Sequence, residues 1–285
     1  MKLSKVRGAI HLARYLSLRG FDVWSLDLRG HGQSEKPKFF DSQYYAWGFE
    51  DFLKEEIPLA LDYLRENALT KQIHWIGHSM GGVLLYCFLA LGNSSQIKSG
   101  VIIGSSLDYS SSESGLRKIK KFKNLIRILR VIPLGITSKI LSVFVGYCFN
   151  RLESFNYWPN NVERTARRRL HKVGFDSISS QVLLQLSTAI ERGGLVSKNG
   201  FNFSDACAII STPILAIAGD RDEQCPPEAA KTTFSLVGST DKKFILIGKN
   251  NGAKNNYGHF DLIIGRDATE EVFPHILSWL NAHLS

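Results

Sequence analysis

The chain has 285 residues, 44% of them hydrophobic, so it can bury a sizeable core as one domain with an insertion or as two small domains. Its 35 Lys and Arg outnumber 26 Asp and Glu, and the net charge of +9 is compatible with nucleic acid, an anionic membrane or an acidic substrate. The four cysteines form no CxxC pair, which argues against a zinc or redox motif and favours a reducing, cytoplasmic location.

Neither the first residues nor the most apolar window predicts export or a membrane span. The opening MKLSKVRGAIHLARYL lacks the uninterrupted apolar stretch of a secretory signal and predicts an amphipathic helix. The apolar window at 131–149 contains Pro133, Gly135 and Lys139, which disfavours a helix across a bilayer.

Short apolar runs, each followed by Gly or a turn residue, predict the strands of the core. Most are too apolar to alternate, which is typical of parallel strands covered on both faces. The predicted strands are 21–28, 72–76, 100–104, 213–218 and 243–247.

Helical patterns separate these strands and define the predicted domains. Residues 48–66 and 268–284 carry apolar side chains at helical spacing and are expected to pack on the sheet. Residues 109–205 are basic, mostly helical and without clear strands. We therefore predict an α/β fold with a mostly parallel sheet and helices on both faces. The core is formed by 1–108 and 206–285, and a helical cap is inserted at 109–205.

The motif G-H-S-M-G at residues 77–81 follows a predicted strand and precedes a helix expected to begin near Val83. A G-x-S-x-G turn forces strained backbone at the serine and leaves its hydroxyl exposed, and the flanking glycines leave room for that bend. An ordinary glycine-rich turn would share the motif, but the strand and helix around it favour a nucleophile. Ser79 is thus the candidate nucleophile.

The residues beside Ser79 are candidates for supporting roles. The helix that follows directs its first amides at the site, so the Met80 N–H is expected to stabilise an oxyanion. His78 and Gly81 are candidates for lining a substrate pocket, although packing at the elbow is the better interpretation of His78.

A carboxylate and a histidine follow two later strands. Asp222 comes just after the strand 213–218, where it can orient an imidazole, while Asp220 could cap the turn instead. His259 follows the strand 243–247 through a polar loop, and a surface histidine is the plainer alternative. The chain order Ser79, Asp222, His259 is the one expected for this arrangement on an α/β sheet.

Four motifs in order make the sequence similar to the α/β-hydrolase superfamily, in particular to lipases and acid-lipase-related members. They are D-L-R-G-H-G-Q-S at 27–34, G-H-S-M-G-G at 77–82, G-D-R-D at 219–222 and Y-G-H-F-D at 257–261. Related dehalogenases and epoxide hydrolases would carry Asp at position 79, and polyhydroxyalkanoate synthases would carry Cys. The resemblance therefore implies a Ser-His-Asp triad that works through an ester intermediate, with no metal or cofactor.

The sequence departs from the superfamily at its beginning. Members have strands before the segment equivalent to 27–34, and one of them ends in an H-G loop that supplies the second oxyanion amide. Here the chain is expected to begin at the following helix, and His31-Gly32 is no substitute because it belongs to the later motif. This departure leaves two alternatives. In the first, strands 21–28 and 72–76 pair with each other, and the helix at 48–66 is the crossover that connects them. In the second, the natural protein is longer. We favour the second.

The cap contains an unusual run of positive charge. Between Ser114 and Leu152 there are nine basic residues and no acidic one, interleaved with apolar side chains, and 117–130 predicts a basic amphipathic helix. Such a helix can lie on an anionic membrane, or it can be a solvated face of the cap. No recognised motif supports nucleic acid as a partner.

We predict a hydrolase that cleaves carboxylic esters of lipids or other small acyl compounds through an acyl-enzyme. An acyltransferase or thioesterase with the same triad is one alternative. The other is a catalytically impaired homologue that acts as a binding protein, which the incomplete oxyanion hole makes plausible.

Overall fold

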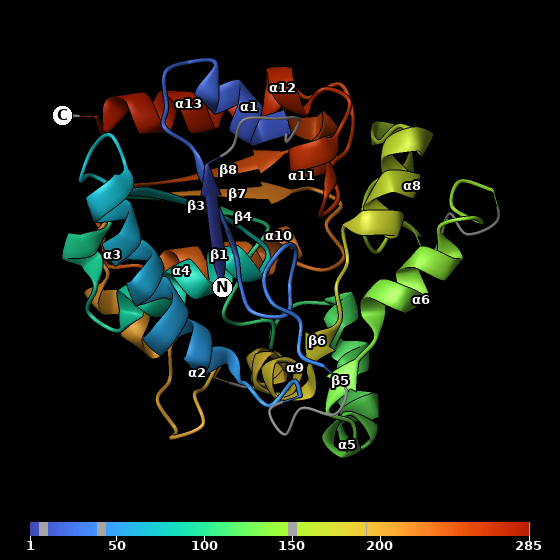
Figure 1. The fold of residues 1–285 in the computed structure, drawn as a ribbon. Helices are drawn as coiled ribbons and strands as arrows, with labels where there is room; N and C mark the ends of the chain where they lie inside the picture. The colour runs from blue at the N-terminus through green and yellow to red at the C-terminus, as the bar shows by residue number, and fades with distance from the viewer. Residues whose placement is uncertain (6–10, 39–43, 148–152, 192, 285) are drawn as a thin grey trace. The chain divides into compact units, whose positions relative to one another are not determined.

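The computed structural model describes residues 1–5, 11–38, 44–147, 153–191 and 193–284 (Figure 1). The chain divides into two compact units. The first consists of Met1–Lys71, Lys118–Asn150 and Glu163–Ser187, and the second of Gln72–Arg117, Arg151–Val162 and Thr188–Ser285. The predicted domain boundaries after 108 and 205 stay a prediction.

A four-stranded parallel sheet forms the centre of the second unit, in the order β3-β4-β7-β8. The predicted strands from residue 72 onward are confirmed, with ends shifted by one or two residues. All residues of β4 and β7 are buried, which is why these runs are uniformly apolar. The bounds are β3 (His74–His78), β4 (Ser99–Ile103), β7 (Ile214–Gly219) and β8 (Lys242–Ile247).

Helices cover both faces of this sheet, as predicted. Figure 1 shows α4 and α10 on one side and α11, α12 and α13 on the other. The bounds are α4 (Met80–Ala90), α10 (Pro227–Leu236), α11 (Asp261–Ile264), α12 (Ala268–Glu271) and α13 (Phe273–Ala282). Short 3-10 turns are η2 (Ser94–Gln96), η3 (Gly115–Lys118), η4 (Pro159–Asn161), η5 (Ser187–Ile190), η6 (Asp205–Ile209) and η7 (Lys249–Asn251).

Two predicted helix bounds in this unit need correction. Helix α4 begins at Met80 and not near Val83, because the sharp backbone bend at Ser79 completes the turn in one residue. The pattern at 268–284 forms two helices, since Pro274 lies in the first turn of α13 and its ring opposes a continuous helix.

The first unit contains the N-terminal elements and most of the helical cap. Its N-terminal elements are β1 (Lys2–Lys5), α1 (His11–Ser17), β2 (Trp24–Asp27), α2 (Phe49–Asp51), the π-helix η1 (Phe52–Glu56) and α3 (Ile57–Asn67). Its cap elements are α5 (Ile119–Ile128), β5 (Val131–Ile132), α6 (Leu134–Leu141), α8 (Arg164–Val173), β6 (Ile178–Ser179) and α9 (Ser180–Leu186).

The expectation that the chain begins at a helix was wrong, and the less favoured of the two alternatives, direct pairing of strands, is not observed among the described residues. A strand, β1, precedes the first helix, and the predicted amphipathic helix is limited to α1. Strand β2 forms an antiparallel ladder with β1, whereas β3 is an edge strand of the four-stranded sheet, so the expected direct pairing of 21–28 with 72–76 is not formed among the described residues. The segment K-L-S-K is too short to show a period, and only its ladder with β2 identifies it as a strand. Residues 6–10 lie outside the described residues.

The helical segments of this unit also carry local irregularities. The predicted helix at 48–66 contains a π-turn just before Pro58, which has no N–H to donate to the carbonyl four residues earlier. In the cap, β5 and β6 form a short antiparallel ladder that periodicity did not predict. Within the described residues, no helix has both the length and the hydrophobicity to cross a bilayer.

Truncation of one buried side chain on strand β7 tests the packing of the core. Ile217 on β7 is 1% exposed, so Ile217→Ala is expected to lower the free energy of unfolding by about 2–5 kcal/mol through a cavity. Ile209→Ala is the matched control, because Ile209 is 57% exposed and its truncation leaves no cavity. Urea unfolding of both variants measures the difference, and equal losses would contradict this assignment of the core.

Candidate active site

Ser79 lies at a sharp turn between β3 and α4 with φ 52° and ψ −120°, a conformation that residues bearing a Cβ rarely adopt. Two contacts hold it: its N–H donates to the Ile103 carbonyl at 2.9 Å, and its carbonyl accepts from the Ser105 hydroxyl at 2.7 Å. The strained elbow that the motif predicts is therefore present.

Two of the glycines around Ser79, Gly77 and Gly82, are required because neighbouring atoms approach them closely. A Cβ on Gly77 would lie 2.3 Å from the Gly81 carbonyl oxygen, and one on Gly82 would lie 2.3 Å from the Ser105 hydroxyl. Gly81 itself has open space where a Cβ would be, so it is not sterically required. Its predicted place in a substrate pocket stays a prediction.

Met80 is the first residue of α4, so its N–H lies in the turn where a helix has no internal acceptor for its amides. The amides of Gly82 and Val83 instead donate to the Ser79 carbonyl at 3.0 and 3.1 Å. The Met80 N–H and the positive end of the helix are thus available to stabilise negative charge beside Ser79.

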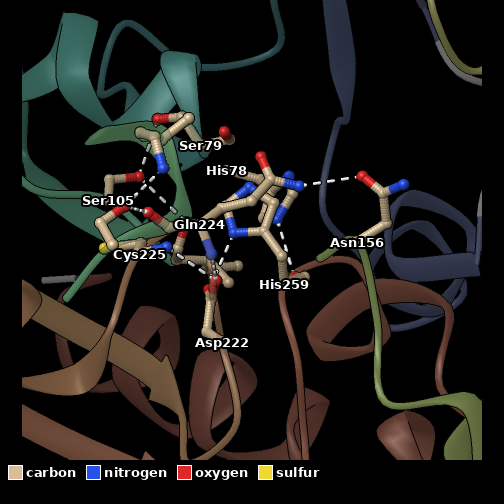
Figure 2. Close-up of polar contacts among 11 residues, drawn as sticks. His78, Ser79, Ser105, Asn156, Asp222, Gln224, Cys225 and His259 are labelled. Atoms are coloured by element: carbon tan, nitrogen blue, oxygen red, sulfur yellow. Dashed lines mark hydrogen bonds and ion pairs between the residues drawn. The ribbon is translucent and has the colours of Figure 1, made fainter. Parts of the chain in front are cut away.

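Asp222 and His259, which are 37 residues apart in sequence, meet in the buried interior of the second unit (Figure 2). The Nδ1 of His259 lies 2.8 Å from Oδ2 of Asp222, and both side chains are buried. The other carboxylate oxygen of Asp222 accepts the amides of Gln224 at 2.9 Å and Cys225 at 2.7 Å. These bonds fix the carboxylate and through it the orientation of the imidazole.

The second ring nitrogen of His259, Nε2, is buried and forms no hydrogen bond with the described residues. Because Nδ1 faces a carboxylate, Nε2 is the nitrogen able to accept a proton. Figure 2 shows Ser79 and His259 in the same cluster, above the carboxylate of Asp222.

His78, the residue just before Ser79, contacts the candidate base His259. Its Nε2 donates to the His259 carbonyl at 3.0 Å, and the two ring centroids are 4.6 Å apart. Burial lowers the pKa of His78 to about 3, with a smaller contribution from His259, so the ring is neutral near pH 7. His78 therefore supports the backbone of His259, and its place in a substrate pocket stays a prediction.

The two aspartates after β7 have different partners. Asp220 accepts the Tyr257 amide at 2.8 Å and so ties the turn after β7 to the loop that carries His259. Burial raises the pKa of Asp220. The structure thus brings Asp222, and not Asp220, to the imidazole.

Sequence reasoning missed three residues that enclose the site. Gly104, after β4, has φ 57°, and a Cβ there would lie 3.1 Å from Asp222 Oδ2 and 3.2 Å from His259 Nδ1. Gln224 donates from Nε2 to Asn156 Oδ1 at 3.1 Å, and the carbonyl of Asn156 accepts the Phe260 amide at 2.8 Å. The position of Gln224 two residues after Asp222 was a usable signal, whereas nothing in the sequence marks Asn156.

A further carboxylate, Asp261, is fully buried near the pair and accepts from Asn161 Nδ2 at 3.1 Å. Burial raises its pKa from 3.8 to about 7, although the Gly258 amide and Asn161 oppose that shift. Asp261 is therefore partly protonated near neutral pH.

The packing of the elbow can be tested with two Gly→Ala substitutions that differ in the room available for the new methyl group. Gly77→Ala is expected to lower the free energy of unfolding by about 1–3 kcal/mol or more, because the new methyl group overlaps backbone atoms. Gly81→Ala should be nearly neutral, since its methyl group meets no atom within 4 Å. Urea unfolding midpoints give the comparison. A Gly77→Ala variant as stable as Gly81→Ala would show that the elbow is not packed as described.

Asp261 should make stability depend on pH. Its folded-state pKa is raised, so its contribution is fully present below the unfolded value near 3.8 and is lost as pH rises through about 7. Asp261→Asn should therefore reduce the loss of stability between about pH 4 and pH 7. Thermal melts across this range measure it, with Asp205→Asn at an exposed position as control. An unchanged pH profile would contradict the raised pKa.

Known proteins resemble the chain in sequence and in fold. It is 25% identical to gastric triacylglycerol lipase of Homo sapiens over 147 residues, half of this chain but only 35% of the lipase. Lipase member K of Mus musculus is 21% identical over 96% of this chain and 74% of its own. The fold is similar to that of monoacylglycerol lipase from Paleococcus ferrophilus (TM-score 0.64, 20% identity, 95% and 88% of the two chains). It is also similar to an esterase from Exiguobacterium antarcticum (TM-score 0.62, 14% identity, 98% and 90%).

A family model covers most of the chain as well. The model described as serine aminopeptidase, S33, matches residues 5–249, which include the elbow and Asp222 but end before His259. Given this match and the parallel sheet with its nucleophile-type elbow, the chain belongs to the serine aminopeptidase S33 family of α/β-hydrolases, among relatives of the lipase and esterase type.

Proposed function

We propose that the protein hydrolyses carboxylic esters, with Ser79 as nucleophile, His259 as base and Asp222 as the acid that orients it. The observation that carries this proposal is the buried Asp222–His259 pair, whose remaining nitrogen has no hydrogen-bond partner among the described residues and lies beside a strained serine elbow. Such an arrangement is suited to taking a proton from a hydroxyl and returning it to a leaving group.

The proposed reaction has two steps. His259 Nε2 takes the Ser79 proton while the serine oxygen attacks the acyl carbonyl, and the Met80 N–H donates to the resulting oxyanion. The imidazolium, stabilised by Asp222, then gives its proton to the leaving alcohol, so that an acyl-serine remains. In the second step His259 activates water, which releases the carboxylic acid and restores Ser79.

An acyl ester or lipid is the proposed substrate class. The relatives matched in sequence are described as lipases, including a lysosomal acid lipase/cholesteryl ester hydrolase of Rattus norvegicus. The matched segment covers 35% of human gastric lipase, so the activity of that whole protein enters here only as support. Localisation in the cytoplasm stays a prediction from the cysteine pattern.

Hydrolysis of p-nitrophenyl acetate and longer p-nitrophenyl esters tests the triad. Ser79→Ala is expected to reduce kcat by about 10⁵–10⁶, and Asp222→Asn by about 10⁴, because each removes a group that acts only together with the others. Asp241→Asn is the matched control and should leave kcat unchanged, since Asp241 is 59% exposed and pairs with a different histidine, His283, at 3.0 Å.

Three outcomes would overturn the proposal. Ser79→Ala could keep the wild-type rate, or the wild type could fail to hydrolyse any ester and to react with a fluorophosphonate probe. The third outcome is cleavage of an aminoacyl p-nitroanilide but not of the esters, which would assign the site to amide bonds. An added alcohol that captures the acyl group faster than water would move the reaction to acyl transfer.

A further inference from the structure

Exposed hydrophobic side chains are concentrated in one part of the cap. Of the 22 large hydrophobic residues found exposed among the described residues, 11 lie between residues 122 and 147. This segment, called here the 122–147 surface, includes α5, β5 and α6. Soluble proteins rarely gather apolar side chains this densely on a surface unless that surface binds something.

The longer segment 114–152, which contains this surface, carries the net charge of the protein. Nine of the 35 Lys and Arg lie between residues 114 and 152, where there is no Asp or Glu, which leaves 26 basic residues to balance the 26 acidic ones elsewhere. Formally, the whole charge of +9 therefore resides in these 39 residues. The positive potential is local to the cap and is not a general property of the chain.

Helix α5 presents one side of its apolar stripe outward. The helix contacts α9, and Ile126 is buried. Leu125 and Ile128 of the same stripe are 55% and 81% exposed, and Arg127 lies between them in sequence. The contact with α9 therefore covers only part of the apolar stripe and leaves the rest exposed to solvent.

Helix α6 shows the same division. It contacts α8, where the Ser138 hydroxyl lies 3.0 Å from His171 Nδ1. Ile136 and Ile140 are four residues apart and share one helix face, and Ser138, midway between them, lies on the opposite face. Both isoleucines are more than 60% exposed, so the apolar side of α6 faces away from α8.

We propose that the 122–147 surface binds the surface of an anionic lipid bilayer. Apolar side chains that enter the headgroup region, flanked by Lys and Arg beside anionic headgroups, are the combination by which interfacial helices bind. A nucleic acid would use the charge but would gain nothing from exposed isoleucines. The binding is peripheral, since no described helix can span the bilayer. It goes beyond the proposed chemistry and does not depend on it.

Co-sedimentation with vesicles of phosphatidylcholine alone, or of phosphatidylcholine mixed with anionic phosphatidylglycerol, tests the proposal. Two triple variants separate the two contributions. The charge variant is Arg127→Gln, Arg130→Gln, Lys139→Gln, and the apolar variant is Ile128→Ser, Ile136→Ser, Ile140→Ser. Their matched controls are Lys231→Gln, Lys243→Gln, Lys249→Gln and Leu69→Ser, Ile209→Ser, Leu284→Ser, all at exposed positions.

The wild type is expected to bind the anionic vesicles and to be released by salt. The charge variant should bind about a hundredfold more weakly, at about fivefold for each charge removed. The apolar variant should lose binding as well, and both controls should bind like the wild type. Hydrolysis of p-nitrophenyl acetate, measured in parallel, should be the same in all five proteins, so failure of the proposed chemistry would be seen separately.

Absence of wild-type binding to anionic vesicles at low salt would overturn the proposal, and so would equal binding by the two variants and their controls. Light scattering of the protein without vesicles measures its oligomeric state and so tests whether a second copy of the chain occupies this surface instead. A dimer that the apolar variant converts to a monomer, without vesicle binding by either, would assign the surface to a second copy of the chain.

Discussion

The backbone at Ser79 is held in a conformation that costs energy, and the site depends on the contacts that hold it there. Residues with a Cβ in this region of φ and ψ typically cost about 1–3 kcal/mol, so the surroundings must over-determine the turn. They do so through the hydrogen bond from the Ser79 N–H to the Ile103 carbonyl, the hydrogen bond from the Ser105 hydroxyl and the close approach of Gly77 to Gly81. The strain is compensated by the adjoining strand β4, because two of these contacts come from its end.

The parallel sheet explains why the other candidate residues meet the elbow. In a parallel sheet all carboxyl ends lie along one edge, and the loops after β3, β4, β7 and β8 therefore converge. Each of these loops contributes one group: Ser79, Gly104, Asp222 and His259. Glycine is favoured at position 104 because its φ is 57° and because a Cβ there would crowd both members of the buried pair.

The apolar residues of the cap differ from those of the core in their exposure to solvent. The strands β4 and β7 are apolar because they are buried on both faces. The 122–147 surface is apolar while exposed, and it carries positive charge without any acid to neutralise it. Half of the exposed large hydrophobic residues of the described chain are thus concentrated in one segment without acidic residues, and this concentration is the basis on which we propose it as an interaction surface.

The sequence by itself determined the four strands of the central sheet, the serine elbow, the two aspartates after β7 and the histidine after β8, because each follows a local pattern of apolar runs, glycines and turn residues. Only the tertiary structure decided that Lys2–Lys5 is a strand, that Asp222 rather than Asp220 meets His259, and that Gln224 and Asn156 join beside them. These features rest on hydrogen bonds between residues distant in the chain. Such bonds leave no periodicity in either partner's own sequence.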